Sequence, residues 1–175
     1  MLKKILIGVL ILIVLVVAVS FVLPNHYNVS RTVVIQADVA KVHEMCGDLK
    51  NWPKWTPWEK ADPTVKTQLS DVTTGVGAHQ SWTSDGGNGE LTLTRCDPAT
   101  GVAYDMNFID GERTMPAKSW MNYKAVAGGV EVEWGIEGDM RIPVIGPYFA
   151  MCADSMMGGM FQQGLDELKS VCEAK

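Results

Sequence analysis

Residues that could carry out catalysis are few in this chain and lie apart in its sequence. His26, His43 and His79 are its histidines, and none is spaced from a serine, a cysteine or a carboxylate as in a known catalytic set. The sequence has no GxSxG turn, phosphate-binding glycine loop or HExxH motif. Tyr104, His79 and Glu90 are the best candidates for acid–base work, but they match no known set. The sequence therefore predicts no catalytic residues, and an enzyme is the less favoured interpretation.

Sulfur-containing side chains gather near the C-terminus. Cys152, Met156 and Met160 recur at a spacing of four, which would place three soft ligands for Cu(I) on one face of a helix. Copper sites usually add histidine or further thioethers, so the sequence predicts neither a metal nor another cofactor. Thioethers also adapt to irregular ligands, so these residues with Met151 and Met157 favour an apolar cavity wall. Ordinary core packing is the alternative.

The four cysteines show no pattern of a redox or zinc site. Cys46, Cys96, Cys152 and Cys172 include no CxxC pair. On one straight helix, the last two would lie about 30 Å apart, too far for a disulfide bond. Either a bridge crosses from one of the first two to this helix, or the cysteines are free.

The N-terminal segment is long enough to cross a membrane. Residues 5–23 carry no charge and would form a helix of roughly 28 Å, the thickness of bilayer hydrocarbon. We interpret residues 1–24 as a transmembrane anchor; a signal peptide cleaved near Ala18-Val19-Ser20 is the alternative. Lys3 and Lys4 precede the segment, which predicts a cytoplasmic N-terminus in a bacterial inner membrane and a periplasmic domain.

The rest of the chain is acidic. Removing Lys3 and Lys4 from the total of 15 basic residues leaves 13 against 20 acidic ones, a net charge of −7. The sequence has no basic stripe. Nucleic acid is therefore excluded as an expected partner, and so is tight electrostatic adhesion to anionic lipid.

Most of the domain alternates between apolar and polar residues with period two. We expect seven strands, at residues 29–36, 65–69, 78–84, 89–95, 102–109, 118–126 and 130–137. Short turns between successive strands predict an antiparallel meander. A short helix follows Asp38, and Pro53 and Pro57 make a corner that carries Trp52, Trp55 and Trp58. The tryptophans of this corner are either structural or at the rim of a pocket, and Trp58 could alternatively rest at the lipid surface.

A long helix closes the chain, starting near Tyr148, because apolar residues recur there at spacings of three and four. It contains Gly158, Gly159 and Gly164, each of which costs about 1 kcal/mol relative to alanine. We therefore expect either a sheet or a ligand to approach this helix closely.

These elements predict an α+β fold in which a curved sheet covers the C-terminal helix. Such a sheet need not collapse fully, so a cavity can remain between the two layers. Nine residues are expected to line it and bind a ligand: Trp82, Tyr104, Met106, Phe108, Trp120, Trp134, Cys152, Met156 and Met160.

Several short motifs resemble a known family. They are Val33 to Ala37, Trp52 with Trp55-Thr56-Pro57-Trp58, Asp62-Pro63, Gly75 to Ala78, Ser81-Trp82, Gly89, and Met156 to Gly159 followed by Phe161, Gly164-Leu165, Leu168-Lys169 and Glu173. In this order they resemble the polyketide cyclase/dehydrase branch of the START-like, Bet v 1-like (SRPBCC) superfamily, over residues 29–173. The resemblance implies a helix-grip fold whose cavity binds lipids, sterols or polyketides and in a minority of members catalyses cyclisation, dehydration or hydrolysis. His79 departs from the common pattern.

The expected organisation is an anchor at residues 1–24, a tether at 25–28 and a helix-grip domain at 29–175. The tether spans at most about 17 Å, which holds the domain close to the membrane. We therefore predict a membrane-anchored module that binds an apolar small molecule or lipid. The alternatives are an accessory subunit of a larger membrane complex and a cyclase or hydrolase acting in the cavity.

Overall fold

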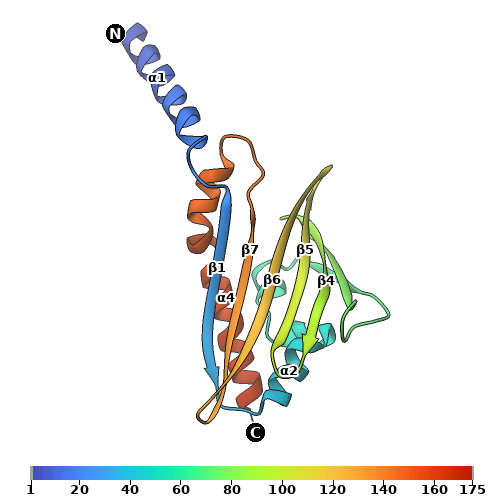
Figure 1. Ribbon diagram of the computed structural model, residues 1–175. Coiled ribbons are helices and arrows are strands. Elements are labelled where there is room, and N and C mark those ends of the chain that lie inside the picture. The colour runs from blue at the N-terminus through green and yellow to red at the C-terminus, as the bar shows by residue number, and fades with distance from the viewer. Residues whose placement is uncertain (1, 175) are drawn as a thin grey trace.

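The fold is a curved antiparallel sheet around a long helix, the helix-grip arrangement expected from the sequence (Figure 1). The computed structural model describes residues 2–174, so Met1 and Lys175, at the ends of the expected anchor and domain, lie outside it. The strands are β1 (His26–Ile35), β2 (Lys66–Leu69), β3 (His79–Thr83), β4 (Asn88–Asp97), β5 (Gly101–Asp110), β6 (Arg113–Val126) and β7 (Gly129–Asp139). Their order is β1-β7-β6-β5-β4-β3-β2, and all neighbours are antiparallel. The predicted meander is confirmed, and β1 completes the sheet beside β7.

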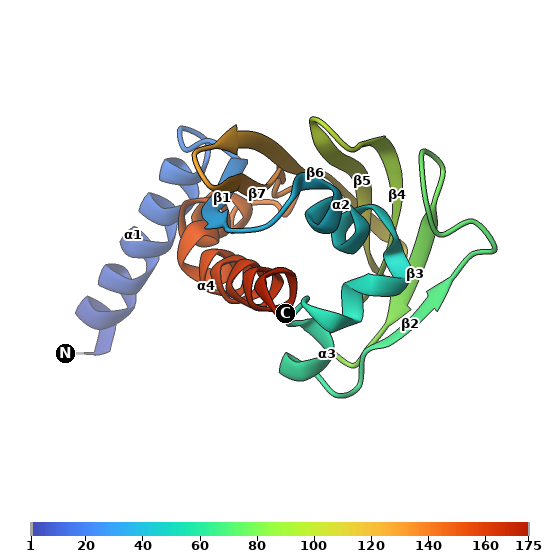
Figure 2. The same ribbon diagram turned by 90° about the horizontal axis from the view of Figure 1, so that it is seen from below.

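The helices of the described residues are α1 (Leu2–Ser20), α2 (Val39–Gly47), the 3-10 helix η1 (Leu49–Lys54), α3 (Trp58–Ala61) and α4 (Gly146–Glu173). Figure 2 shows α4, α2 and α3 on the concave side of the sheet. α4 begins before the expected Tyr148, because Pro147 fits the first turn of a helix, where its missing N–H is not needed. α1 is long and apolar enough to cross a membrane, a property that an anchor and a signal sequence share.

β1 begins earlier than expected. His26 pairs with Asp139 and Asn28 with Glu137, so the expected tether at residues 25–28 belongs largely to the sheet. Tyr27 lies between them and is buried against Gly138, where a Cβ atom would lie 2.7 Å from the tyrosine hydroxyl. The missing side chain of this glycine therefore lets Tyr27 extend the strand. Residues 21–25 are the link between α1 and β1.

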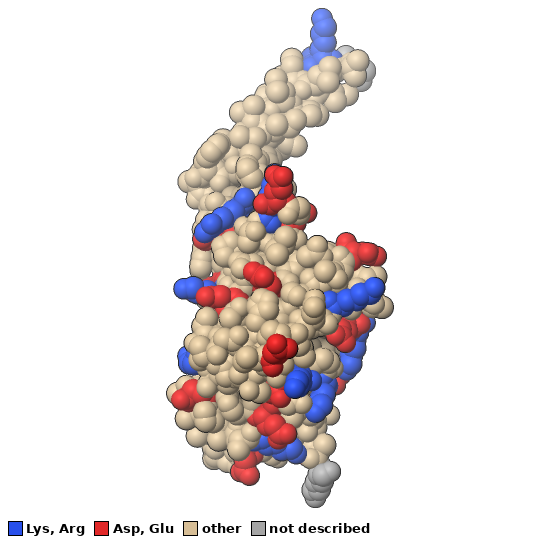
Figure 3. Space-filling view, turned by 90° about the vertical axis from the view of Figure 1, so that its right-hand side faces the viewer, with Lys and Arg blue, Asp and Glu red and all other residues tan. Residues whose placement is uncertain are grey.

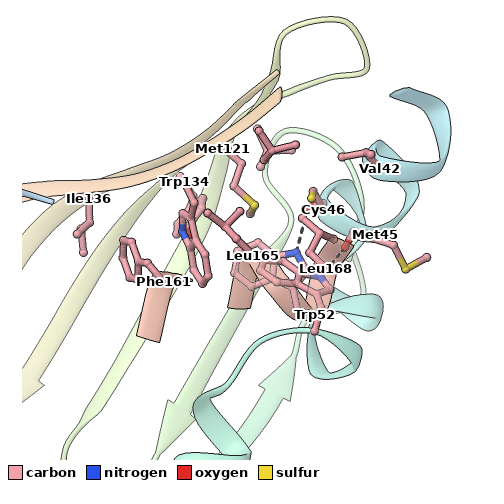
Figure 4. Close-up of a cluster of buried hydrophobic side chains, with 14 of the residues drawn as sticks. Val42, Met45, Cys46, Trp52, Met121, Trp134, Ile136, Phe161, Leu165 and Leu168 are labelled. Carbon is pink, nitrogen blue, oxygen red and sulfur yellow. Dashed lines mark hydrogen bonds between the residues drawn. The ribbon is translucent and has the colours of Figure 1, made fainter. Parts of the chain in front are cut away.

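Two tryptophans of the proline-rich corner are part of the core, which Figure 4 shows in part. Trp52 Nε1 donates a hydrogen bond to the carbonyl oxygen of Cys46 (2.9 Å), and Trp55 Nε1 donates one to that of Met45 (3.1 Å). Both carbonyls lie in the last turn of α2, where a helix has no internal donor for them. Trp52 and Trp55 therefore satisfy the C-terminal end of α2, which is a structural role.

Side chains of the sheet explain two of the three glycines in α4. A Cβ atom at Gly158 would collide with the guanidinium of Arg31 on β1. One at Gly164 would lie 2.6 Å from Cζ3 of Trp134 on β7, whereas Gly159 faces open space. The close approach expected from the sequence is therefore made by side chains that project from the sheet.

Alanine substitutions at Gly159 and Gly164 are expected to have opposite effects. Gly159→Ala should raise the free energy of unfolding by up to about 1 kcal/mol, since alanine favours the helix and meets no neighbour. Gly164→Ala should lower it by about 1 kcal/mol net, because overpacking against the buried Trp134 costs about 1 to 3 kcal/mol. Urea unfolding of the full chain in detergent, followed by circular dichroism, measures both. Equal shifts in the same direction would show that Trp134 does not fix the position of α4.

Candidate functional site

A cavity of about 380 Å³ lies between the concave face of the sheet and α4. Ala61 of α3 and Thr67 of β2 are the exposed residues of its wall and mark its mouth, with Met157 and Met160 of α4 also in the wall. Most of the wall is aromatic or aliphatic. Six of the expected residues line it: Trp82, Tyr104, Met106, Phe108, Trp134 and Met160. That these six bind a ligand stays a prediction.

Three of the expected residues lie elsewhere, and their placement is corrected here. Trp120 is on the outer face of the sheet, because Ser119 and Met121 on either side of it take the inward positions of β6. Its ring covers Gly135, and its Nε1 donates to Glu133 Oε2 (3.4 Å). Cys152 and Met156 are exposed on α4. They lie on the outer side of the helix, whereas Met160, four residues after Met156, belongs to the wall of the cavity.

The inward stripe of α4 instead passes through Ala153, Met157, Phe161 and Gly164. These positions follow the same three-and-four spacing, so periodicity alone does not distinguish the two faces. Burial of Phe161 under Trp134, with ring centroids 4.4 Å apart and planes at 1°, decides which face is covered (Figure 4). The sequence signal for the covered face was Gly164, because this glycine lies on the same stripe of α4 and allows Trp134 to approach.

Other residues of the wall were missed by the sequence reading. Gln80 of β3 points inward beside Trp82, since residues two apart in a strand share a face. Because glutamine is polar, Gln80 resembled a solvent-facing residue. The inward position of Trp82, two residues later on the same strand, predicts that Gln80 also points inward. The corner tryptophans, by contrast, were expected either in the core or at a pocket rim: Trp52 and Trp58 border the cavity, while Trp55 is enclosed in the core. Trp58 packs edge-on against Trp134, with ring centroids 5.9 Å apart.

The three candidates for acid–base work are not brought together. Tyr104 lies in the cavity wall, where its hydroxyl accepts a hydrogen bond from Trp134 Nε1 (3.0 Å). His79 and Glu90 lie on the other face of the sheet. Nδ1 of His79 is 3.0 Å from Thr92 Oγ1, and Glu90 Oε1 accepts from the Asn107 amide (3.0 Å). The sheet therefore separates the tyrosine from the histidine and the carboxylate.

The titratable side chains of the wall are Tyr104 and Asp62. Burial raises the pKa of Tyr104 to about 12, so its hydroxyl stays protonated at neutral pH. Asp62, near the mouth, accepts hydrogen bonds from the hydroxyl (2.6 Å) and backbone N–H (2.9 Å) of Thr64, and these lower its pKa. It is a carboxylate at neutral pH. Neither group has a pKa suited to proton transfer near pH 7.

Alkaline pH should destabilise the protein through Tyr104. Raising the pH from 10 to 12 is expected to remove about 2 kcal/mol of stability, because an unfolded tyrosine titrates near 10 while the pKa of folded Tyr104 is raised to about 12. This stability is fully present below pH 10 and lost as the pH rises toward 12. Tyr104→Phe removes the titrating group and should lose correspondingly less. Urea unfolding of both proteins across this range measures the difference, and equal losses would contradict the assignment.

The cysteines and the metal-binding groups form no separate site in the described residues. All four cysteines are free, so neither Cys46 nor Cys96 forms a disulfide bridge to α4. Burial raises the pKa of Cys46 to about 12 and that of Cys172 to about 11, which makes both thiols unreactive near neutral pH. Within residues 2–174, no three His, Cys, Asp or Glu side chains gather closely enough to hold a metal ion.

The same arrangement of sheet and helix recurs among solved structures. The protein CV1439 from Chromobacterium violaceum matches with a TM-score of 0.60 and 14% sequence identity, over 86% of this chain and 99% of that one. The protein jhp0584 from Helicobacter pylori matches with a TM-score of 0.63 and 16% identity, over 83% and 88%. Ara h 8.0201 matches with a TM-score of 0.56 and 15% identity, over 83% and 99%. Identities this low show a common fold and nothing about activity.

The family is given by the sequence itself. No curated protein matches the chain. A family model described as polyketide cyclase / dehydrase and lipid transport matches residues 26–173, from the first residue of β1 to the last residue of α4. This match includes the whole sheet, the closing helix and every residue of the cavity wall. The chain therefore belongs to the polyketide cyclase / dehydrase and lipid transport family of the Bet v 1-like, SRPBCC superfamily.

Proposed function

We propose that this protein is a membrane-anchored binding module that holds an apolar small molecule or lipid between the sheet and α4. The carrying observation is the cavity of about 380 Å³, whose wall is mainly aromatic, aliphatic and thioether side chains. Its residues include no group with a pKa near neutrality. Binding is therefore better supported than acid–base catalysis, and the cyclase or hydrolase alternative has no set of residues to carry it.

The anchor in this proposal is α1. Its mean hydropathy is 2.9 over the membrane-length window, and no part of that window is buried by the domain. Figure 3 shows charges of both signs scattered over the visible face of the domain, whereas α1 is uncharged except near its tip. The two lysines at that tip favour a cytoplasmic N-terminus, which would place the domain in the periplasm of a bacterium.

Contacts at the base of α1 favour a domain held close to the lipid. The Tyr148 hydroxyl donates a hydrogen bond to the carbonyl oxygen of Val16 (2.7 Å), so the start of α4 lies against the last turns of α1. Three apolar side chains are exposed here: Ile145, just before α4, and Phe149 and Met151, in the first turns of α4. Tyrosine at such a position is typical of the membrane–water interface. We infer that the start of α4 rests on the adjacent leaflet.

The cavity is well placed to receive a molecule from that leaflet. Strand pairing connects Tyr27, at the start of β1, to Met106 of β5 and Gln80 of β3 in one continuous row. Phe108 and Trp82 line the cavity beyond this row, toward the end of the sheet from which α1 leaves. A short path from the bilayer suits a module that does not leave the membrane.

Mass spectrometry of the full chain tests the proposal. The protein, purified in mild detergent, should carry about one apolar molecule per chain, seen as an added mass under native conditions and recovered by solvent extraction. Absence of any bound molecule, together with no uptake of added apolar probes, would refute the binding role. The accessory-subunit alternative predicts instead a protein that co-purifies in stoichiometric amount through α1.

A further inference from the structure

A side-chain amide faces the cavity without a hydrogen-bond partner among residues 2–174. Gln80 is 9% exposed and forms part of the cavity wall. Its backbone pairs with Leu69 and Leu91 on the neighbouring strands, but none of residues 2–174 hydrogen-bonds to its side chain. A primary amide offers two donors and an acceptor. Those of Gln80 are open to the space of the cavity, since they are not among the fully enclosed, unpaired side-chain atoms of the described residues. The wall therefore presents a polar group that a bound molecule can satisfy.

Two other polar groups of the wall, the hydroxyls of Tyr104 and Ser119, already have partners. The Tyr104 hydroxyl accepts from Trp134 Nε1 (3.0 Å), and the Ser119 hydroxyl donates to the carbonyl oxygen of Gly135 (2.6 Å). Tyr104 and Ser119 are paired across β5 and β6, so they form one polar spot. Gln80 lies on β3, with β4 between it and β5. Its amide, like the indole N–H groups of Trp58 and Trp82, has no hydrogen-bond partner among the described residues, but only the amide can both donate and accept.

The charges around the cavity act against an anionic guest. No lysine or arginine belongs to the wall, so nothing in it would neutralise a buried carboxylate or phosphate. Asp62 is the charged residue of the wall, and its lowered pKa keeps it negative at neutral pH. An uncharged carbonyl or hydroxyl group avoids both penalties and can still bond with an amide.

We propose that Gln80 is the polar anchor of this cavity and selects an uncharged ligand that carries one carbonyl or hydroxyl group on an apolar body. The inference rests on the proposed binding function and specifies the ligand class. The volume of about 380 Å³ corresponds to that of roughly a dozen water molecules, which suits a single short chain or a compact ring system. A carboxylate of the same length is rejected.

Three brominated probes of equal length separate these properties: 1-bromodecane, 10-bromo-1-decanol and 10-bromodecanoic acid. Bromine quenches nearby tryptophan fluorescence, and Trp52, Trp58, Trp82 and Trp134 all line the cavity while α1 contains no tryptophan. The full chain in lipid nanodiscs is titrated at pH 8, and each affinity is corrected for partition of the probe into lipid. The alcohol should bind at least about fivefold more tightly than the alkane and tenfold more tightly than the acid.

Gln80→Leu should remove the advantage of the alcohol while leaving the affinity for the alkane within about twofold. Gln68→Leu is the matched control, because Gln68 is an exposed glutamine on the adjacent strand β2. Gln80→Met keeps the length of the side chain and replaces the leucine variant if the latter melts early. The wild-type comparison of the three probes stands without any variant.

The outcomes distinguish this inference from the proposed function beneath it. Equal binding of alcohol and alkane, acid binding as tight as alcohol binding, or a Gln80 variant that still prefers the alcohol would each overturn the role of Gln80. Quenching by none of the three probes would overturn the binding function itself. Quenching by the alkane alone would preserve an apolar cavity and refute the polar anchor.

Discussion

Trp134→Ala should lower the free energy of unfolding by about 4 kcal/mol, the range observed when a buried tryptophan is truncated. Trp134 is 1% exposed and lies at the centre of the core. Its ring stacks on Phe161, with centroids 4.4 Å apart, and meets Trp55 edge-on at 5.2 Å. The substitution would also remove the donor to the buried Tyr104 hydroxyl. Because Trp134 joins the sheet to α4, its loss should loosen the two layers together.

Trp120→Ala is the matched control for this experiment. Trp120 is one strand away, on β6, and belongs to the outer face of the sheet. It is half-buried over Gly135 and makes one long hydrogen bond, to Glu133. We expect a loss of about 1 kcal/mol, near the mean for single substitutions. Urea unfolding of the full chain in detergent compares the two variants, and equal losses would show that the core is not centred on Trp134.

The contrast between these tryptophans explains what the sequence could and could not specify. The period-two pattern of β7 places Trp134 inward, and the structure agrees. The same rule applied to β6 places Trp120 outward, since Met121 and Tyr123 take the inward phase. The prediction that Trp120 lines the cavity was based on its aromatic side chain. Its position in the alternating pattern of β6 places it on the outer face. Large aromatic side chains occur on both faces of a sheet, so their type alone does not locate a cavity.

Longer-range features were less accessible. Elements and their order follow from local patterns, so the sheet and the closing helix could be predicted. The pairing of β1 with β7 joins the two ends of the domain and leaves no local signal in either strand. α4 was harder, because Cys152 and Met156 share one helical spacing and Met157 and Phe161 another. Which stripe is covered depends on side chains that arrive from the sheet, chiefly Trp134.

The methionines of α4 give the sharpest test of the cavity, because some of them line it and others are exposed. Met157 and Met160 line it, whereas Met151 and Met156 are exposed on the same helix. Replacing both lining residues by tryptophan fills part of the cavity with two rigid indoles. Affinity for an apolar probe such as 1-bromodecane should fall at least about a hundredfold, which corresponds to about 3 kcal/mol.

Met151→Trp with Met156→Trp makes the same chemical change outside the cavity and should leave this affinity within about twofold. Binding is followed by native mass spectrometry of the full chain, since added tryptophans would complicate a fluorescence reading. Circular dichroism confirms that both double variants keep the fold. If the lining variant retains wild-type affinity, the ligand does not enter between the sheet and α4. If the exposed variant loses affinity equally, the probe binds the outer face of the helix, where the exposed methionines would form its site.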